Sequence, residues 1–77
     1  MPEMRLGVRL TPLKARIFDA IKRAGKDGIE GDDLFRLIFG ERPVKRSCLK
    51  AHVWQINDLL EESGYHITGR RGFRLIR

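Results

Sequence analysis

The stretch that decides the fold runs Arg46-Ser-Cys-Leu-Lys-Ala-His-Val-Trp-Gln-Ile-Asn-Asp-Leu-Leu60 and leads, through Glu61-Glu-Ser-Gly64, into Tyr65-His-Ile-Thr-Gly-Arg-Arg-Gly-Phe-Arg-Leu75. Its first part places apolar residues at helical spacing, and its second part alternates apolar and polar residues around a turn of glycines and arginines. The pattern predicts a helix followed by a basic β-hairpin. The rest of the chain is expected to be the scaffold that holds these two elements.

The helix is predicted over residues 44–63, after the turn Glu41-Arg-Pro43 and before Gly64. Its core stripe consists of Leu49, Val53, Ile56 and Leu60. At roughly 100° per residue, the opposite face carries Ser47, Lys50, Ala51, Trp54, Gln55 and Asp58. Trp54 is the most informative of these, because an exposed tryptophan on a face that should be polar usually marks contact with a ligand or partner.

The segments before this helix predict a strand and two further helices. Residues 4–10 alternate apolar and polar side chains, which indicates a strand with one apolar face and a free edge available for self-pairing. A helix over 12–25 is expected to begin with Thr11 as its cap and Pro12 in its first turn, and to end at Gly25.

A second helix is predicted over 31–39, with Gly40 as its stop. Leu34, Leu37 and Ile38 are expected to form its inner face, and Ile29 before it is expected to make a single-residue strand contact. The glycines of the turn Gly69-Arg-Arg-Gly72 suit the hairpin predicted over 65–76, because they tolerate positive φ.

Composition limits the function. A chain of 77 residues with 42% apolar residues is enough for one domain, 1–77, with one small core. The net charge of +6 favours a polyanionic partner, because lysines and arginines that neutralise phosphates release counterions. We find no signal peptide and no run long enough to span a membrane, so a cytoplasmic protein is the simplest expectation.

No enzyme, cofactor or metal site is predicted. The chain lacks a nucleophile with a neighbouring base and orienting acid, and it lacks a glycine loop that would cradle phosphates. Cys48 and His52 are spaced i,i+4, as two metal ligands on one helix would be, but two ligands without two more favour positions flanking the core.

The order strand, helix, helix, helix, hairpin predicts an α+β winged helix-turn-helix, in which the third helix enters a DNA groove and the hairpin is the wing. The chain also resembles the effector domain of OmpR/PhoB-type response regulators, over residues 10–76. The resemblance is carried by Leu10-Thr-Pro-Leu13, Gly40, Leu49-Lys-Ala-His-Val53 and Gly72-Phe-Arg-Leu75. It implies that the third helix reads the major groove and that the wing reaches the adjacent minor groove or backbone.

By position, the resemblance implies base contacts for Lys50, Ala51, Trp54 and Gln55, phosphate contacts for Ser47 and His52, and a place beside the DNA backbone for Phe39. Three features depart from the family. The sequence contains no receiver domain, so, if the chain is complete, we do not expect control by phosphorylation of an aspartate to carry over. Acidic residues replace arginines in the latter half of the third helix, and the wing arginines are shifted to Arg70 and Arg71.

Double-stranded DNA binding by a small transcriptional regulator of bacterial or phage type is the expected function. Lys45, Arg46 and Lys50 cluster at a helix start, where the positive end of the helix dipole disfavours cations. We therefore expect these side chains to face phosphate. The expected DNA-binding residues are Lys45, Arg46, Ser47, Lys50, Ala51, His52, Trp54, Gln55, Arg70 and Arg71. A monomer in free solution and a dimer on a repeated DNA site are expected, because one small domain reads few base pairs.

The alternative is a winged-helix protein-interaction module. In that hypothesis Trp54 and the acidic edge of Asp58, Glu61 and Glu62 bind RNA polymerase or another transcription protein.

Overall fold

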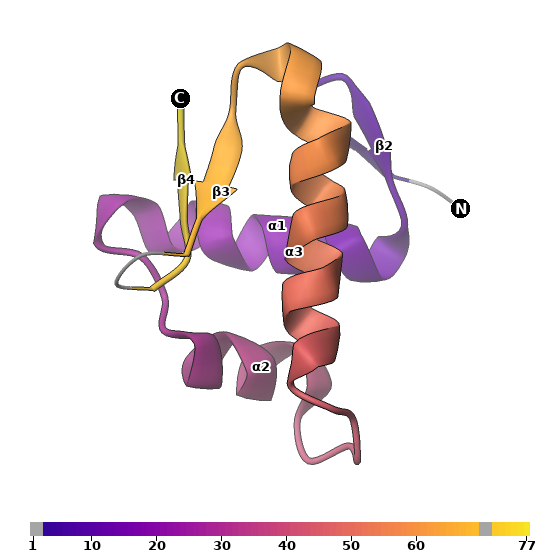
Figure 1. Cartoon of the computed structure of the whole chain (residues 1–77), viewed down its shortest axis with the longest axis vertical. Helices are drawn as coiled ribbons and strands as arrows, with labels where there is room; N and C mark the ends of the chain where they lie inside the picture. The colour runs from indigo at the N-terminus through magenta and orange to yellow at the C-terminus, as the bar shows by residue number, and fades with distance from the viewer. Residues whose placement is uncertain (1–2, 70–71) are drawn as a thin grey trace.

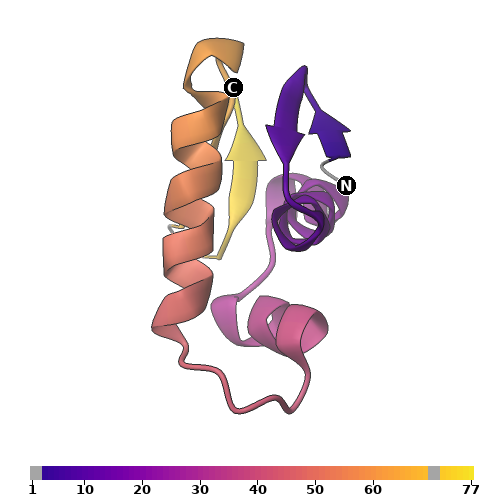
Figure 2. The ribbon, with the colours of Figure 1, turned by 90° about the vertical axis from the view of Figure 1, so that its right-hand side faces the viewer.

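A computed structural model describes residues 3–69 and 72–77 and has an α+β architecture with three α-helices and two small antiparallel hairpins. Along the chain the elements are β1 (Glu3–Arg5), β2 (Val8–Leu10), α1 (Pro12–Ala24), α2 (Gly31–Phe39), α3 (Ser47–Leu60), β3 (His66–Thr68) and β4 (Arg74–Ile76). Figure 1 shows α3 crossing in front of α1, with α2 near its N-terminal end and the β3–β4 hairpin beside it. Figure 2 shows α3 along one side of the molecule and α1 and α2 on the other.

The helix ends follow the capping signals of the sequence. The Thr11 hydroxyl accepts a hydrogen bond from the Lys14 backbone N–H at 3.3 Å, and Pro12 occupies the first turn. Gly25 and Gly40 end α1 and α2 at positive φ, and each donates its N–H back to a carbonyl of the last turn. These capping predictions and the bounds of the second helix are therefore confirmed.

The third helix is shorter than predicted. α3 begins at Ser47 and ends at Leu60, followed by a 3₁₀ turn over Glu61–Ser63, whereas we expected one helix over 44–63. Residues 44–46 stay outside the helix. The Val44 N–H bonds to the Arg42 carbonyl at 2.8 Å in a tight turn around Pro43, and the half-buried Val44 packs on the core. Gly64 adopts the left-handed conformation expected of the helix stop.

The single N-terminal strand predicted over residues 4–10 is wrong, because the segment folds back on itself as a hairpin. β1 and β2 pair antiparallel, with Glu3 opposite Leu10, around a turn at Leu6 and Gly7, both at positive φ. The turn leaves Met4 and Leu6 exposed, whereas alternation along one continuous strand would have put them on an apolar face. Gly7 makes the tight turn possible, because it has no Cβ to clash at positive φ.

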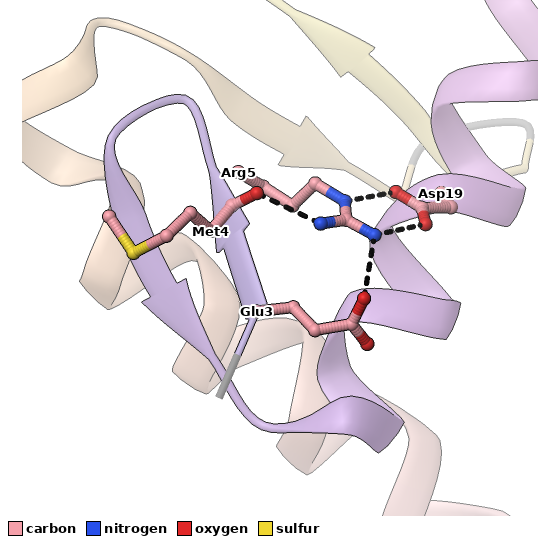
Figure 3. Close-up of polar contacts among 4 residues, drawn as sticks. All are labelled: Glu3, Met4, Arg5 and Asp19. Carbon is pink, nitrogen blue, oxygen red and sulfur yellow. Dashed lines mark hydrogen bonds and ion pairs between the residues drawn. The ribbon is translucent and has the colours of Figure 1, made fainter. Parts of the chain in front are cut away.

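An arginine fastens this hairpin to α1 (Figure 3). The Arg5 guanidinium donates two hydrogen bonds to the Asp19 carboxylate, at 2.7 and 2.8 Å, and one to the Met4 carbonyl at 2.8 Å. A longer contact of 3.3 Å reaches Glu3. The hydrogen bonds from Arg5 hold the pKa of the Asp19 carboxyl below its usual range, and Asp19 in turn raises the pKa of Arg5.

One core lies between the three helices and the base of the C-terminal hairpin. Its buried members are Leu10, Ala15, Ile17, Phe18, Ile21, Leu34, Ile38, Phe39, Leu49, Val53, Ile56, Leu60 and Ile67. The predicted stripe of the third helix is thus confirmed.

The prediction for α2 was wrong at two positions. Leu37 is 58% exposed rather than buried, and Phe39 is buried rather than beside a DNA backbone. The reason is helical phase: the buried stripe of α2 is Leu34, Ile38 and Phe39, with the centroid of the tilted Phe35 ring 4.9 Å from that of Phe39, and Leu37 lies outside this stripe.

The C-terminal hairpin is joined to the segment before α2. Ile29 and Phe73 exchange two backbone hydrogen bonds, of 3.0 and 2.7 Å, which confirms the single-residue strand contact expected at Ile29. Glycines permit this approach: a Cβ on Gly28 would lie 2.7 Å from the Arg74 side chain, and a Cβ on Gly72 would lie 3.1 Å from the Ile29 carbonyl. Both glycines also have positive φ.

Within the part of the chain that the structure describes, no helix is long and apolar enough to cross a membrane.

Candidate nucleic-acid interface

The outer face of α3 carries the residues that the helical projection selected. Its exposed members are Ser47, Lys50, Ala51, Trp54, Gln55 and Asp58. Trp54 has 68% of its surface exposed, the largest value among the exposed large apolar residues of the described chain. Leu49, Val53, Ile56 and Leu60 lie buried on the opposite side, so the helix presents a convex, solvated face with one protruding aromatic ring.

The start of α3 is basic, and one of its cations is held by α2. Lys45, Arg46 and Lys50 are all exposed. Arg46 forms an ion pair with Asp32, in the first turn of α2, and its guanidinium lies 5.9 Å from the centroid of the Phe35 ring. The carboxylate offsets the unfavourable position of a cation at the N-terminal end of the α3 dipole.

A groove opens between this helix start, α2 and the hairpin. It is lined by Gly31, Asp32, Phe35, Arg46, Ser47, Leu49, Lys50 and Phe73. Its floor is apolar, while Lys50, the Ser47 hydroxyl and the Arg46–Asp32 pair form its rim. An anionic group at the rim would meet two cations and one hydroxyl, with one carboxylate opposing it.

His52 lies on a different flank of α3 from Trp54. It is half-buried, and its Nδ1 atom is buried without a hydrogen-bond partner among residues 3–69 and 72–77. Burial lowers the pKa of His52, and the nearby Lys14 of α1 lowers it further. Both effects favour the neutral form of the imidazole beside α1. A phosphate would have to contact the exposed edge of the ring.

The C-terminal half of the α3 face meets the hairpin in an open cleft. The cleft is lined by Trp54, Asn57, Asp58, Glu61, Gly64, Tyr65 and His66. It combines two aromatic rings with two exposed carboxylates, so its character is opposite to that of the helix start. The Arg77 guanidinium lies 5.2 Å from the centroid of the Tyr65 ring, which is a cation–π contact beside this cleft.

Asn57 positions the hairpin relative to α3, a role that was not predicted. Its side-chain amide donates to the Ile67 carbonyl at 2.9 Å, and its carbonyl oxygen accepts from the Ile67 N–H at 2.6 Å. The side chain thus pairs with β3 as a neighbouring strand would. The available signal was an asparagine inside a helix, where its helix propensity is poor and a specific hydrogen bond is a common reason for it.

The predicted wing arginines Arg70 and Arg71 lie outside the described residues. Of the two arginines that follow, Arg74 is half-buried with its Cγ against Gly28, and Arg77 lies over Tyr65. Arg74 and Arg77 therefore each make a local contact within the fold.

The structure brings most predicted site residues to one surface. Ser47, Lys50, Ala51, Trp54 and Gln55 share the outer face of α3, with Lys45 and Arg46 at its start. His52 lies to the side of this face. Cys48 is free and half-buried, and the described residues contain no group of three His, Cys, Asp or Glu side chains that could hold a metal ion.

Comparisons of the chain with protein-family models, with curated proteins and with solved structures find no match.

Proposed function

We propose that this protein is a winged helix-turn-helix that binds double-stranded DNA and acts as a small transcriptional regulator. In this proposal α3 enters the major groove and the C-terminal hairpin is the wing. The observation that supports it most is the outer face of α3, where an exposed run of residue types suited to base and phosphate contact follows a basic helix start.

The side chains on this face suit a base-reading role. Lys50 and Gln55 can hydrogen-bond to base edges, and the small Ala51 lets the helix axis come close to the floor of the groove. Trp54 offers an apolar surface for a thymine methyl group or a sugar. Asp58 follows one turn after Trp54, so the N-terminal two-thirds of the helix would insert and the acidic end would leave the groove.

Phosphate contacts would come from residues around the helix start and from the wing. Lys45 and the Ser47 hydroxyl would meet one strand, whereas the Cys48 and Leu49 backbone N–H groups already donate to the Lys45 and Arg46 carbonyls. Arg46 would share its guanidinium between Asp32 and a phosphate, or exchange one for the other. Arg70 and Arg71 are proposed to meet the backbone or the adjacent groove.

A fluorescence-anisotropy titration with labelled random duplex DNA at several salt concentrations tests the proposal. Neutralisation of about three to five phosphates predicts that log affinity falls against log salt with a slope of roughly −3 to −5. Lys50→Ala should weaken binding, whereas the matched control Lys22→Ala, an exposed cation on α1, should not. No binding at low salt, or a slope near zero, would remove the DNA function.

The second candidate function is a protein-interaction module. It is favoured by the cleft at the acidic end of α3, where Trp54 and Tyr65 lie with the carboxylates of Asp58 and Glu61. Such a cleft suits a cationic side chain of RNA polymerase or another transcription protein. If the chain fails to bind duplex DNA while Trp54→Ala abolishes binding to a purified polymerase, this candidate replaces the first.

A further inference from the structure

The side of the molecule away from the outer face of α3 carries a second groove, between α1 and α2. It is lined by Arg16, Asp19, Ala20, Arg23, Ala24, Ile29, Leu37 and Ile38, and we call it the α1–α2 groove. Its volume is about 410 Å³. The lining includes apolar side chains, among them Leu37, which is 58% exposed.

The charge of the α1–α2 groove is positive. Arg16 and Arg23 are exposed, and among the described residues neither makes a close ion pair, although Arg23 is near enough to Asp19 to help lower the pKa of that carboxyl. The one carboxylate in the lining, Asp19, is already bound by two hydrogen bonds from Arg5. The groove therefore fits a segment that presents an apolar side chain flanked by carboxylates.

The same chain exposes such a segment at the other end of the molecule. Leu59 is 45% exposed near the C-terminal end of α3. Asp58 directly precedes it and Glu62 follows about one turn later, and both carboxylates are exposed. We call these three residues the acidic turn. Figure 1 shows the C-terminal end of α3 and α2 at opposite ends of the molecule, so the acidic turn cannot reach the α1–α2 groove of its own chain.

We propose that two copies of this chain associate head to tail, with the acidic turn of one seated in the α1–α2 groove of the next. Leu59 would contact Leu37 and the alanines of α1, while Asp58 and Glu62 would meet Arg16 and Arg23. The two surfaces differ, so the contact is heterologous and leaves one of each surface free at the ends of a pair. It shares Asp58 with the outer face of α3 but uses neither Lys50 nor Trp54 and does not depend on the proposed function.

The contact should be weak in free solution. Two chains of net charge +6 repel each other, while the paired charges attract only at short range. At about 0.15 M salt the Debye length of roughly 8 Å screens the repulsion between molecular centres more than the attraction at contact. A dissociation constant near 1 mM is expected under these conditions, and it is measurable by amide chemical shifts.

The test is a charge swap followed by NMR without DNA. In the wild type, raising the concentration from about 50 μM to about 1 mM should shift amide signals of residues 16–24, Leu37 and residues 58–62. Arg23→Glu alone and Glu62→Arg alone should each reduce these shifts at least threefold, because each puts like charges together. An equimolar mixture of the two variants should raise the shifts above those of either variant alone, because every contact between unlike variants joins opposite charges, while contacts between copies of one variant stay repulsive.

Matched controls are available on the same elements. Lys22→Glu changes the charge of α1 equally but lies outside the groove lining, and Asp33→Arg does the same for an exposed acid on α2. Both should keep the wild-type shifts, and dispersed amide spectra will verify that every variant is folded. The proposal is overturned if the wild type shows no concentration-dependent shifts at these residues, or if the mixture of variants does not raise them above those of either variant alone. Neither result bears on DNA binding, which the anisotropy titration measures separately.

Discussion

Trp54 combines high exposure with a position at the centre of the outer face of α3. A tryptophan in the core of a small domain is costly to remove, because its large side chain leaves a cavity. Trp54 instead projects between Lys50 and Asp58 on the helix surface and lines an open cleft. The Trp54 side chain adds little to the core, so replacing it should change binding more than stability.

Replacing Trp54 by Ala should cost less than about 1 kcal/mol of unfolding free energy, well below the roughly 3–5 kcal/mol of a buried tryptophan. Binding to the preferred DNA site should weaken by roughly 1–3 kcal/mol, and binding to random duplex should weaken less. Urea denaturation followed by circular dichroism and anisotropy titrations measure the two effects. An unfolded variant would contradict the exposed position, and unchanged affinity for the preferred site would contradict base contact.

A few polar contacts between residues far apart in the chain fix the hairpins relative to the helices. Arg5 fastens the N-terminal hairpin to α1, and Asn57 fastens β3 to α3. The second contact matters more for the proposed function, because it fixes the C-terminal hairpin relative to α3.

Asn57→Ala should destabilise the protein by about 1–3 kcal/mol, because the backbone N–H and C=O of the buried Ile67 lose their partners. Asn57→Asp should also destabilise it, since the carboxylate keeps the acceptor but cannot donate to the Ile67 carbonyl. Gln55→Ala is the matched control, an exposed amide on the same helix, and should be nearly neutral for stability. Equal stabilities for the alanine variants at 55 and 57 would show that the paired hydrogen bonds do not hold the hairpin.

A second prediction concerns Arg70 and Arg71, the two arginines between the strands of the C-terminal hairpin. Replacing Arg70 and Arg71 together by Ala should weaken binding to all DNA sequences and flatten the salt slope by about one to two units, because wing arginines mainly meet backbone or groove potential. Replacing the exposed Lys22 and Lys26 in the same way is the control for loss of two charges. A folded Arg70/Arg71 variant with wild-type affinity would exclude this hairpin as a DNA-binding wing.

Across the whole molecule, charge is divided by location. The start of α3 and the α1–α2 groove are basic, and the C-terminal end of α3 is acidic. This division would let one face meet DNA while the acidic turn and the α1–α2 groove remain available to neighbouring copies.

Global stability also depends on two groups whose pKa differs between the folded and unfolded chain, His52 and Asp19.

The free energy of unfolding should fall in two steps as the pH is lowered. The pKa of His52 lies below its ordinary value, so the unfolded chain takes up a proton first and stability declines as the pH falls below about 6.5. The pKa of Asp19 is also lowered, so its contribution is present above about pH 3.9 and is lost below that.

Denaturation at a series of pH values, with variants, separates the two steps. His52→Gln should remove the first decline and Asp19→Asn should reduce the second, while the exposed His66→Gln should leave both unchanged. A first decline that persists in His52→Gln would rule out the half-buried imidazole as its cause.

Features set by short-range interactions could be predicted from the sequence. The caps at Thr11, Gly25 and Gly40 and the exposed face of α3 depend on residues within one or two turns, where 3.6 residues per turn relates spacing directly to position. Most residues of the candidate site could therefore be placed on one face, because they lie on a single helix.

Features that join distant segments required the folded chain. Alternation at residues 4–10 has the same period in one strand and in a hairpin, so it could not reveal the turn at Leu6 and Gly7. The apolar residues of α2 allowed more than one phase, and burial of Leu34, Ile38 and Phe39 in the shared core left Leu37 exposed. The pairing of Asn57 with Ile67 spans 10 positions, and Arg5 with Asp19 spans 14, so neither follows from periodicity. Such contacts depend on how the elements cross, which burial of the shared core determines.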